Sequence, residues 1–134
     1  MKAEDPARRS ATMRAVKSRD TTPELAVRAL LRRFAPFYRL HRKDVLGNPD
    51  IAYLGMKRAI FVHGCFWHGH DCARGARAPK ANADYWRAKI ARNRVRDAAN
   101  VEKLQVAGWR ALTVWECELK ELNALEARLR AFLQ

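Results

Sequence analysis

The sequence predicts a single α/β domain with a central mixed sheet flanked by helices. Apolar residues recur at helical spacing in long segments, and short apolar runs bounded by turn residues lie between them. The expected order of elements is α-α-β-β-β-α-β-α, which is typical of helices packed on a sheet. A chain of 134 residues is long enough to bury such a core. We find no repeat or linker, so residues 1–134 are expected to form one domain, with residues 1–20 as a basic arm that contains a short helix over Ala7–Lys17.

The first long helix is expected to begin at Thr21. Thr21 and Glu24 have the spacing of a capping box, and Pro23 suits the first turn of a helix. Apolar residues at positions 27, 30, 31 and 34 follow the helical pattern, and Pro36 closes the segment.

Turn residues separate the segments that follow. Gly47-Asn48-Pro49 predicts a turn, Gly55 joins two strands, and Gly108 suits the C-terminal end of a helix. Strands are predicted over Phe37–His41, Ile51–Leu54, Ala59–His63 and Ala111–Trp115, and helices over about Asn82–Val106 and Leu119–Leu133.

The chain is strongly basic. Lysine and arginine number 27 against 14 acidic residues, which gives a formal net charge of +13 and a pI of about 10.5. Such a balance favours a polyanionic partner, because each neutralised phosphate releases condensed counterions. No apolar run approaches the ~20 residues of a membrane span, and the N-terminal segment lacks the apolar core of a secretory signal. We therefore expect a cytoplasmic nucleic-acid-binding protein that does not enter membranes.

The segment from His63 to Cys72 concentrates three histidines and two cysteines. An odd count of three cysteines argues against a disulfide framework and favours metal ligation. A closed zinc shell of three thiolates and one imidazole is available from Cys65, His70, Cys72 and Cys117. His63 and His68 also lie within reach, so the spacing does not select the histidine. Cys117 alone is equally consistent with a small core side chain.

A carboxylate precedes one predicted strand, as in metal-dependent nucleases that carry Pro-Asp followed by a strand with acid-x-Lys. Here Asp50 follows Pro49, but Phe61 and His63 stand at the acidic and lysine positions of the next strand. Asp50 and a neighbouring backbone carbonyl can hold Mg²⁺, which prefers oxygen ligands. The alternative is that Asp50 is an ordinary turn residue.

One stripe of the long predicted helix carries an aromatic residue at its head and basic residues along its length. Trp86, Lys89, Asn93 and Arg96 recur at helical spacing. A charged stripe is often a solvated face, but the nearby Phe66-Trp67 pair favours contact with nucleic acid.

Short motifs run in order along nearly the whole chain. They are Arg9-Ser10-x-x-Met13-Arg14-Ala15, Arg19-Asp20-Thr21, Pro49-Asp50, His63-Gly64-Cys65-Phe66-Trp67-His68, Trp86-x-x-Lys89-Ile90-x-x-Asn93, Gly108-Trp109-Arg110 and Val114-Trp115-Glu116-Cys117. Together they resemble bacterial very short patch repair (Vsr-type) endonucleases, and the His-Gly-Cys-Phe-Trp-His block is highly specific.

The resemblance implies a restriction-endonuclease-like fold of the PD-(D/E)XK type and an enzyme that nicks one DNA strand beside a T:G mismatch. It implies Asp50 as ligand of a catalytic Mg²⁺, together with the backbone carbonyl of Val62. His68 is the implied catalytic histidine, and His63 and Glu24 are implied supporting groups around the metal waters. Structural Zn²⁺ is assigned to Cys65, His70, Cys72 and Cys117.

The resemblance also implies a set of DNA contacts. The implied wedge beside the mismatch is Phe66, Trp67 and Trp86, with Met13 from the arm and with Lys89 and Asn93 facing the mismatched pair. The sequence departs from the family where Val62 replaces a frequent threonine and where Gly69 and Asp71 interrupt a histidine-rich run. The implied partners are T:G-mismatched duplex DNA and mismatch-repair proteins, and the expected state is a monomer in the bacterial cytoplasm, associated with the nucleoid when bound to DNA.

Several alternatives stay open from the residues themselves. His68 could also be a zinc ligand or a plain DNA contact. His63 could be a structural histidine at a strand end, and Glu24 could be a capping glutamate in the first turn of its helix. Two other functions are a restriction or junction nuclease of the same fold and a non-catalytic zinc-stabilised DNA-binding module. The presence of both Asp50 and His68 counts against the module, because binding needs neither.

Overall fold

A computed structural model describes residues 21–65, 70 and 82–134 of the chain. The elements are α2 (Thr22–Arg32), β1 (Arg39–Leu40), β2 (Ile51–Tyr53), β3 (Arg58–His63), α3 (Ala83–Val106), β4 (Arg110–Trp115), the 3₁₀ helix η1 (Glu116–Lys120) and α4 (Leu122–Phe132). The four strands lie in the order β1-β2-β3-β4. The first two pairings are antiparallel and β3 pairs with β4 in parallel, so the predicted mixed sheet is confirmed.

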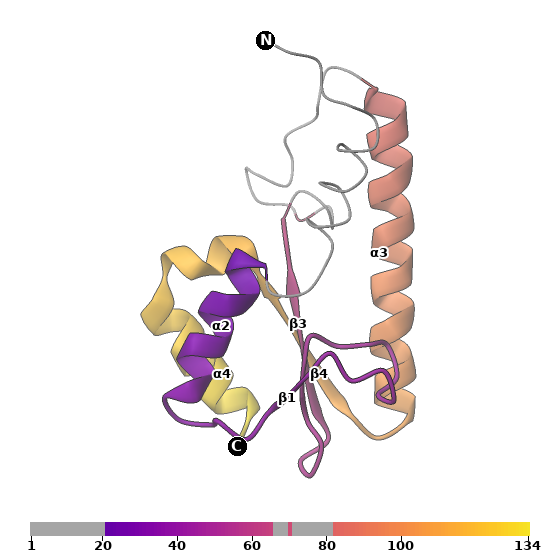
Figure 1. The fold of residues 1–134 in the computed structure, drawn as a ribbon. Helices are drawn as coiled ribbons and strands as arrows, with labels where there is room; N and C mark the ends of the chain where they lie inside the picture. The colour runs from indigo at the N-terminus through magenta and orange to yellow at the C-terminus, as the bar shows by residue number, and fades with distance from the viewer. Residues whose placement is uncertain (1–20, 66–69, 71–81) are drawn as a thin grey trace.

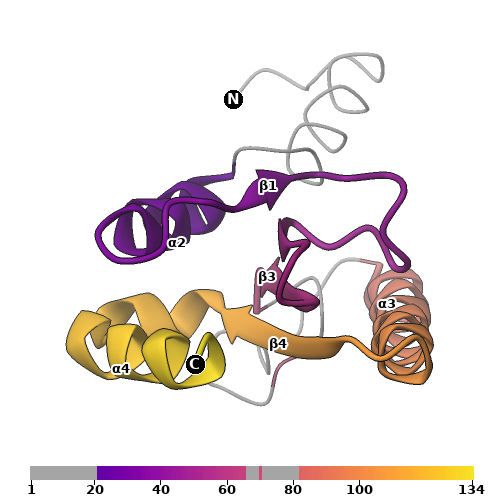
Figure 2. The same ribbon diagram turned by 90° about the horizontal axis from the view of Figure 1, so that it is seen from below.

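Helices cover both faces of the sheet. Helices α2 and α4 lie side by side on one face, and α3 lies on the other (Figures 1 and 2). Because side chains of a strand alternate between the two faces, each layer has its own apolar core. The α2 and α4 side buries Val27, Leu30, Leu31, Ile51, Tyr53, Ile60, Val114, Leu125 and Leu129, and the α3 side buries Val45, Ala52, Ala59, Phe61 and Leu104.

Helix α2 begins where its capping residue predicts. The Thr21 side chain accepts a hydrogen bond from the Glu24 backbone N–H at 3.3 Å, and Val27 and Leu31 are fully buried. The helix ends at Arg32, before Pro36. The Glu24 side chain points to other partners, described below, so only the threonine half of the capping box forms.

Two predictions at the strand and helix ends were wrong in extent. The strand expected over Phe37–His41 is reduced to the two residues of β1. The helix expected over Leu119–Leu133 is divided into η1 and α4, because Glu121 adopts a non-helical backbone with φ of −124° and ψ of 70°. The Glu118 carboxylate accepts from the Trp115 N–H at 3.0 Å and from Arg128 at 2.7 Å, which stabilises the tighter 3₁₀ turn.

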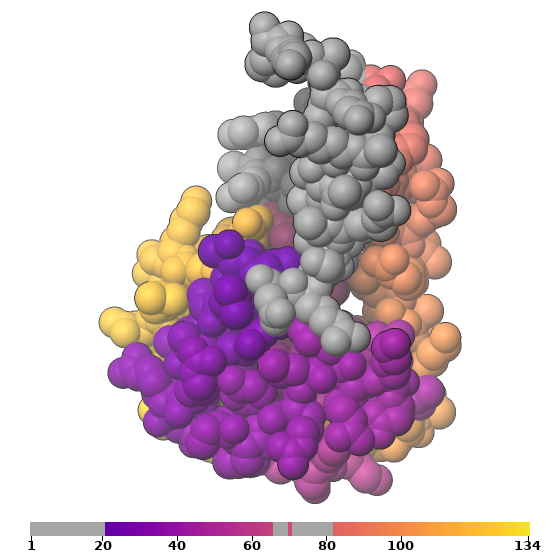
Figure 3. Space-filling model, viewed as in Figure 1, coloured from indigo at the N-terminus to yellow at the C-terminus, as the bar shows by residue number. Residues whose placement is uncertain are grey.

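The loop between β1 and β2 packs against α3. Gly47 has φ of +80°, and a Cβ built there would lie 3.1 Å from the Cβ of Asn100, so the predicted turn needs glycine both for its backbone and for its space. The segment that carries β1 and β2 covers the lower part of the face in Figure 3, next to α2.

The predicted helix over Ala7–Lys17 lies outside the described residues. Within the described residues, no helix combines the length and apolar character needed to cross a membrane.

Candidate active site

Three potential metal ligands meet where α2 begins and where β1 leads into β2. Glu24 lies in the first turn of α2, His41 follows β1, and Asp50 precedes β2. One ligand atom from each lies within 4.8 Å of the others. Glu24 and Asp50 were predicted from the sequence to act together, whereas His41 was not.

Asp50 is held by backbone groups from the strands on both sides. Its Oδ2 accepts a hydrogen bond from the Val62 N–H of β3 at 2.7 Å. Its own carbonyl accepts from the His41 N–H at 3.1 Å, which extends the β1–β2 ladder by one residue. Asp50 is therefore fixed between its neighbours, and the backbone of Val62 lies beside its carboxylate.

Glu24 is a buried carboxylate with two side-chain partners. It is 2 % exposed, and its Oε2 accepts from Arg28 at 2.9 Å and contacts His41 Nε2 at 3.0 Å. A buried carboxylate requires such compensation, because removing the charge from water costs several kcal/mol. This position is unlike that of a capping glutamate, whose carboxylate would turn back to the backbone N–H of Thr21.

His41 is the residue that sequence reasoning missed. It is the one histidine outside residues 63–70, it directly follows a strand, and its φ is +49°, in the left-handed region. Its contact with Glu24 joins residues 17 apart in the chain. The sequence did offer one signal, a histidine at the end of a predicted strand and ahead of Pro49-Asp50. No spacing rule, however, relates His41 to Glu24, which lies in a helix earlier in the chain.

The carboxylates of Glu24 and Asp50 fit a site for a divalent cation, and His41 lies beside them. In octahedral Mg²⁺ coordination the ligand atoms lie about 2.1 Å from the ion and therefore no more than about 4.2 Å from one another. Donor atoms within 4.8 Å of one another need only a small adjustment to reach that geometry. Two carboxylates supply the hard oxygen ligands that Mg²⁺ prefers.

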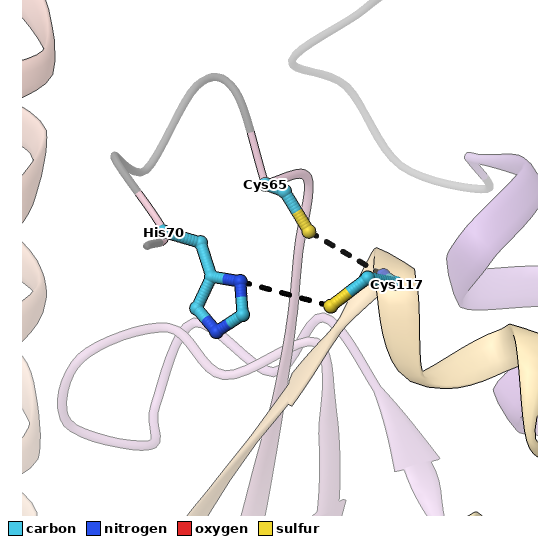
Figure 4. A group of neighbouring side chains, drawn as sticks. All are labelled: Cys65, His70 and Cys117. Carbon is cyan, nitrogen blue, oxygen red and sulfur yellow. Dashed lines mark hydrogen bonds between the residues drawn. The ribbon is translucent and has the colours of Figure 1, made fainter. Parts of the chain in front are cut away.

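A second cluster lies at the ends of β3 and β4. Cys65 follows β3, Cys117 lies in η1 directly after β4, and His70 approaches from the loop that follows Cys65 (Figure 4). Cys65 Sγ accepts from the Cys117 N–H at 3.4 Å, and Cys117 Sγ lies 3.7 Å from His70 Nδ1 (Figure 4). These contacts place three of the four predicted zinc ligands together.

The second cluster has the dimensions of a tetrahedral zinc site. Bond lengths of about 2.3 Å to sulfur and 2.05 Å to nitrogen put neighbouring ligand atoms about 3.6 Å apart. The ring of His70 stacks on Trp115 with centroids 4.3 Å apart, and the His70 backbone N–H donates to the Cys65 carbonyl at 3.0 Å. The structure therefore favours a ligand position for Cys117 over an isolated core side chain, and it brings His70 into the cluster.

His63 lies on the α3 side of β3, the face that also buries Phe61. Its ring packs edge-on against Trp115 at 5.3 Å between centroids, and its Nδ1 lies 3.8 Å from Asp97 of α3. His63 and His70 both line a cleft of about 690 Å³ between α3 and β4. A role of His63 beside Asp50 stays a prediction.

Two of the four residues in the predicted stripe on α3 are buried, whereas the side chain of Arg96 is 60 % exposed. Lys89 and Asn93 are each 9 % exposed, and Lys89 Nζ lies 5.7 Å from the ring centroid of Trp86. This burial contradicts the alternative of an ordinary solvated face for these two residues. The remaining predicted site residues, Met13, Phe66, Trp67, His68 and Cys72, lie outside the described residues.

Comparisons with known proteins agree with this architecture. Residues 1–74 match the family described as DNA mismatch endonuclease Vsr. The chain is 51 % identical over 128 residues to the type II nicking enzyme V.XorIIP of Xanthomonas oryzae pv. oryzae, covering 96 % of this chain and 93 % of that protein. It is 39 % identical over 116 residues to the DNA mismatch endonuclease Vsr of Escherichia coli K12, covering 87 % and 74 %. Among solved structures, the catalytic domain of the homing endonuclease I-Bth0305I is similar with a TM-score of 0.56 and 25 % identity, covering 84 % of this chain and 94 % of that domain.

Proposed function

The chain belongs to the Vsr family of DNA mismatch endonucleases, and we propose from this that it nicks one strand of duplex DNA beside a T:G mismatch, with Mg²⁺, to initiate very short patch repair. That it is a DNA-nicking endonuclease follows from the family and from its nicking relatives. The proposed Mg²⁺ dependence is supported by one observation, the convergence of Glu24 and Asp50 beside the backbone of Val62, and the proposed T:G specificity is supported by the family alone.

Phosphodiester hydrolysis needs an activated water, neutralisation of charge on the phosphate, and a proton for the leaving oxygen. Asp50 and the Val62 carbonyl are the proposed Mg²⁺ ligands. The bound ion would neutralise phosphate charge and acidify its coordinated water. The hydrogen bond from the Val62 N–H keeps the Asp50 carboxylate against β3, where that carbonyl is available.

His68 is the proposed general base. An imidazole with a pKa near ~6.5 can accept the proton of the attacking water at neutral pH. Glu24 and His63 are proposed to orient waters around the site. The support for Glu24 is direct, since it lies next to Asp50, whereas His63 contacts Asp97 and Trp115 on the α3 side.

Recognition of the mismatch is assigned to aromatic and polar side chains from separate segments. The proposed wedge is Phe66, Trp67 and Trp86, assisted by Met13 from the N-terminal arm, and Lys89 and Asn93 face the mismatched pair. Unstacking a base step costs a few kcal/mol and is least costly at a mismatch. The net charge of +13 supports the phosphate contacts that hold the duplex.

We further propose that structural Zn²⁺ is held by Cys65, His70, Cys72 and Cys117. The proximity of the three described ligands supports this set. We also propose a single-domain cytoplasmic monomer that meets the nucleoid through DNA and interacts with mismatch-repair proteins.

A nicking assay on matched duplexes tests the proposal. The protein is incubated with T:G-mismatched DNA or with the same duplex carrying C:G, each with Mg²⁺ or EDTA. We expect one nick, in one strand beside the mismatch, only with the mismatched duplex and only with Mg²⁺. Equal cutting of both duplexes would instead support a restriction-type or junction nuclease, and mismatch binding without cutting would support a non-catalytic module.

A further inference from the structure

We propose that His41 is a positioning residue of the catalytic-metal site, which holds the Glu24 carboxylate toward Asp50. The proposal rests on the Mg²⁺-dependent function proposed above, because it adds a residue to that site. The side chain of His41 bonds to Glu24, which is not itself a proposed Mg²⁺ ligand, so we expect its effect to pass through Glu24.

The contact between the two side chains fixes the role of the imidazole. His41 Nε2 lies 3.0 Å from Glu24 Oε2, and the two side chains are 14 % and 2 % exposed. An ionised carboxylate only accepts hydrogen bonds, so Nε2 carries the hydrogen in this contact. A ring nitrogen that donates its hydrogen has no lone pair to offer a metal, and His41 Nε2 is therefore a support for Glu24 and not a ligand.

Glu24 has a second partner whose role differs. Arg28 donates to the same oxygen at 2.9 Å, but it lies one turn along the same helix and moves with Glu24. His41 directly follows β1 and is joined to Asp50 by the backbone hydrogen bond of 3.1 Å. The histidine contact is thus the one that fixes the distance between α2 and Asp50.

The two donors also orient the carboxylate. Both bind Oε2, so Oε1 is left to accept from a water in the first hydration layer of a cation at Asp50. Groups that orient the ligands and waters of a metal site contribute strongly to its affinity, and their loss commonly weakens metal binding about 10- to 100-fold.

The backbone of His41 supports a functional use of its side chain. Its φ of +49° lies in a region that costs a non-glycine residue on the order of 1 kcal/mol or more. Asparagine or glycine would adopt it more easily. The strained residue is held by the ladder that pairs Leu40 with Ile51 and by its own bond to Asp50, and this geometry turns the imidazole toward Glu24.

The test compares three substitutions at this position. His41→Leu removes the donor, His41→Gln keeps an N–H donor on a chain of similar length, and His41→Asn suits the left-handed backbone but is too short to reach Glu24. Leu46→Gln, in the same loop and 51 % exposed, is the matched control. Zinc-loaded protein is titrated with Mn²⁺ alone and free Mn²⁺ is followed by electron paramagnetic resonance, while the Mg²⁺ dependence of single-turnover nicking is measured in parallel.

We expect His41→Leu and His41→Asn to weaken Mn²⁺ binding and to raise the half-saturating Mg²⁺ concentration about 10- to 100-fold. The nicking rate at saturating Mg²⁺ should fall much less, and His41→Gln should recover most of the metal affinity. The asparagine variant keeps the test valid if the leucine variant fails to fold, because asparagine relieves backbone strain.

Unchanged Mn²⁺ affinity in both His41→Leu and His41→Asn would overturn the inference. Equal loss in His41→Gln and His41→Leu would also overturn it, since the imidazole would then act as a ligand. The Asp50→Asn variant distinguishes a failure of the His41 inference from a failure of the proposed function. If Asp50→Asn binds Mn²⁺ as tightly as the unsubstituted protein, the catalytic ion is held elsewhere and the proposed Mg²⁺ site is wrong.

Discussion

The Val62 backbone N–H and the Asp50 carboxylate form a hydrogen bond of 2.7 Å that links the residue before β2 to the C-terminal end of β3. A hydrogen bond to an ionised acceptor is roughly twice as strong as a neutral one. It holds one carboxylate oxygen of Asp50 at the edge of β3. Asp50 is therefore presented in a fixed orientation by the strand that carries its proposed partner carbonyl.

Asp50→Asn should abolish nicking while mismatch affinity stays equal or rises. The amide oxygen still accepts from Val62, so the fold is retained, but the negative charge that binds a cation is lost. Removing a negative charge near phosphate also reduces repulsion. Gel-shift and single-turnover nicking assays on one T:G duplex measure both effects, and Leu46→Gln serves as the control. Nicking by Asp50→Asn at the unsubstituted rate would reject the metal-ligand role.

His68→Ala should slow nicking by about 10²- to 10⁴-fold with little change in stability or DNA affinity, because a general base acts only on the water. The same single-turnover assay gives the rate, and elemental analysis gives the zinc content. An unchanged rate would remove the general-base role. Loss of zinc would make His68 a ligand and His70 the better catalytic candidate.

Cys117→Ala should release zinc and lower the melting temperature or unfold the protein. The Cys117 sulfur lies 3.7 Å from His70 Nδ1 and the Cys117 backbone N–H donates to Cys65 Sγ, so the side chain belongs to the proposed shell, and an opened shell loses the folding free energy that the metal supplies. Elemental analysis should give one zinc per chain for the unsubstituted protein and for Asp50→Asn. A variant of full stability, together with unsubstituted protein that contains no zinc, would contradict the assignment.

Trp67→Ala should weaken binding to T:G-mismatched DNA more than binding to the matched duplex. A stacked base contributes ~1–3 kcal/mol, whereas phosphate contacts are the same for both duplexes. The salt dependence of binding should be unchanged, because no charge is removed. Fluorescence anisotropy at several salt concentrations measures both quantities. An equal loss on the two duplexes would indicate that Trp67 is a packing residue.

Tyr53→Phe should destabilise the protein by about 0.5–1.5 kcal/mol at neutral pH, because the Tyr53 hydroxyl donates to the Ala35 carbonyl at 2.7 Å in the core. Burial, with a smaller contribution from Tyr38, raises the pKa of Tyr53 far above its ordinary value. A raised folded-state pKa stabilises the protein below the unfolded pKa near ~10, and this contribution is lost as the pH rises above it. Urea unfolding between pH 8 and 11 measures how the free energy of unfolding falls as the pH rises. This fall should be smaller for Tyr53→Phe than for the unsubstituted protein, and identical pH profiles of the two proteins would contradict the prediction.

Local sequence signals predicted most elements of the fold. Thr21 and the apolar spacing located α2, and the glycine at position 55 located the turn between β2 and β3. The prediction failed where the deciding contacts are tertiary. The 3₁₀ turn at Glu116–Lys120 depends on Arg128, ten residues after Glu118, which no periodicity reveals.

The same limit applies to the site. Asp50 and the zinc ligands stand in recognisable motifs, but His41 gains its meaning only from the packing of α2 against the β1–β2 segment. The alternation of side chains along β3 also explains how Phe61 and His63 are placed relative to Asp50. Phe61 and His63 face α3, while Asp50 is bound at the backbone of the residue between them.

The hydrogen bond from the His70 backbone N–H to the Cys65 carbonyl, 3.0 Å long, joins two of the proposed zinc ligands through the main chain. Restricting the distance between two ligands removes conformational entropy before any metal arrives. The protein therefore arranges part of the proposed zinc shell by itself, so zinc should bind there more tightly than to the same side chains on an unrestrained segment.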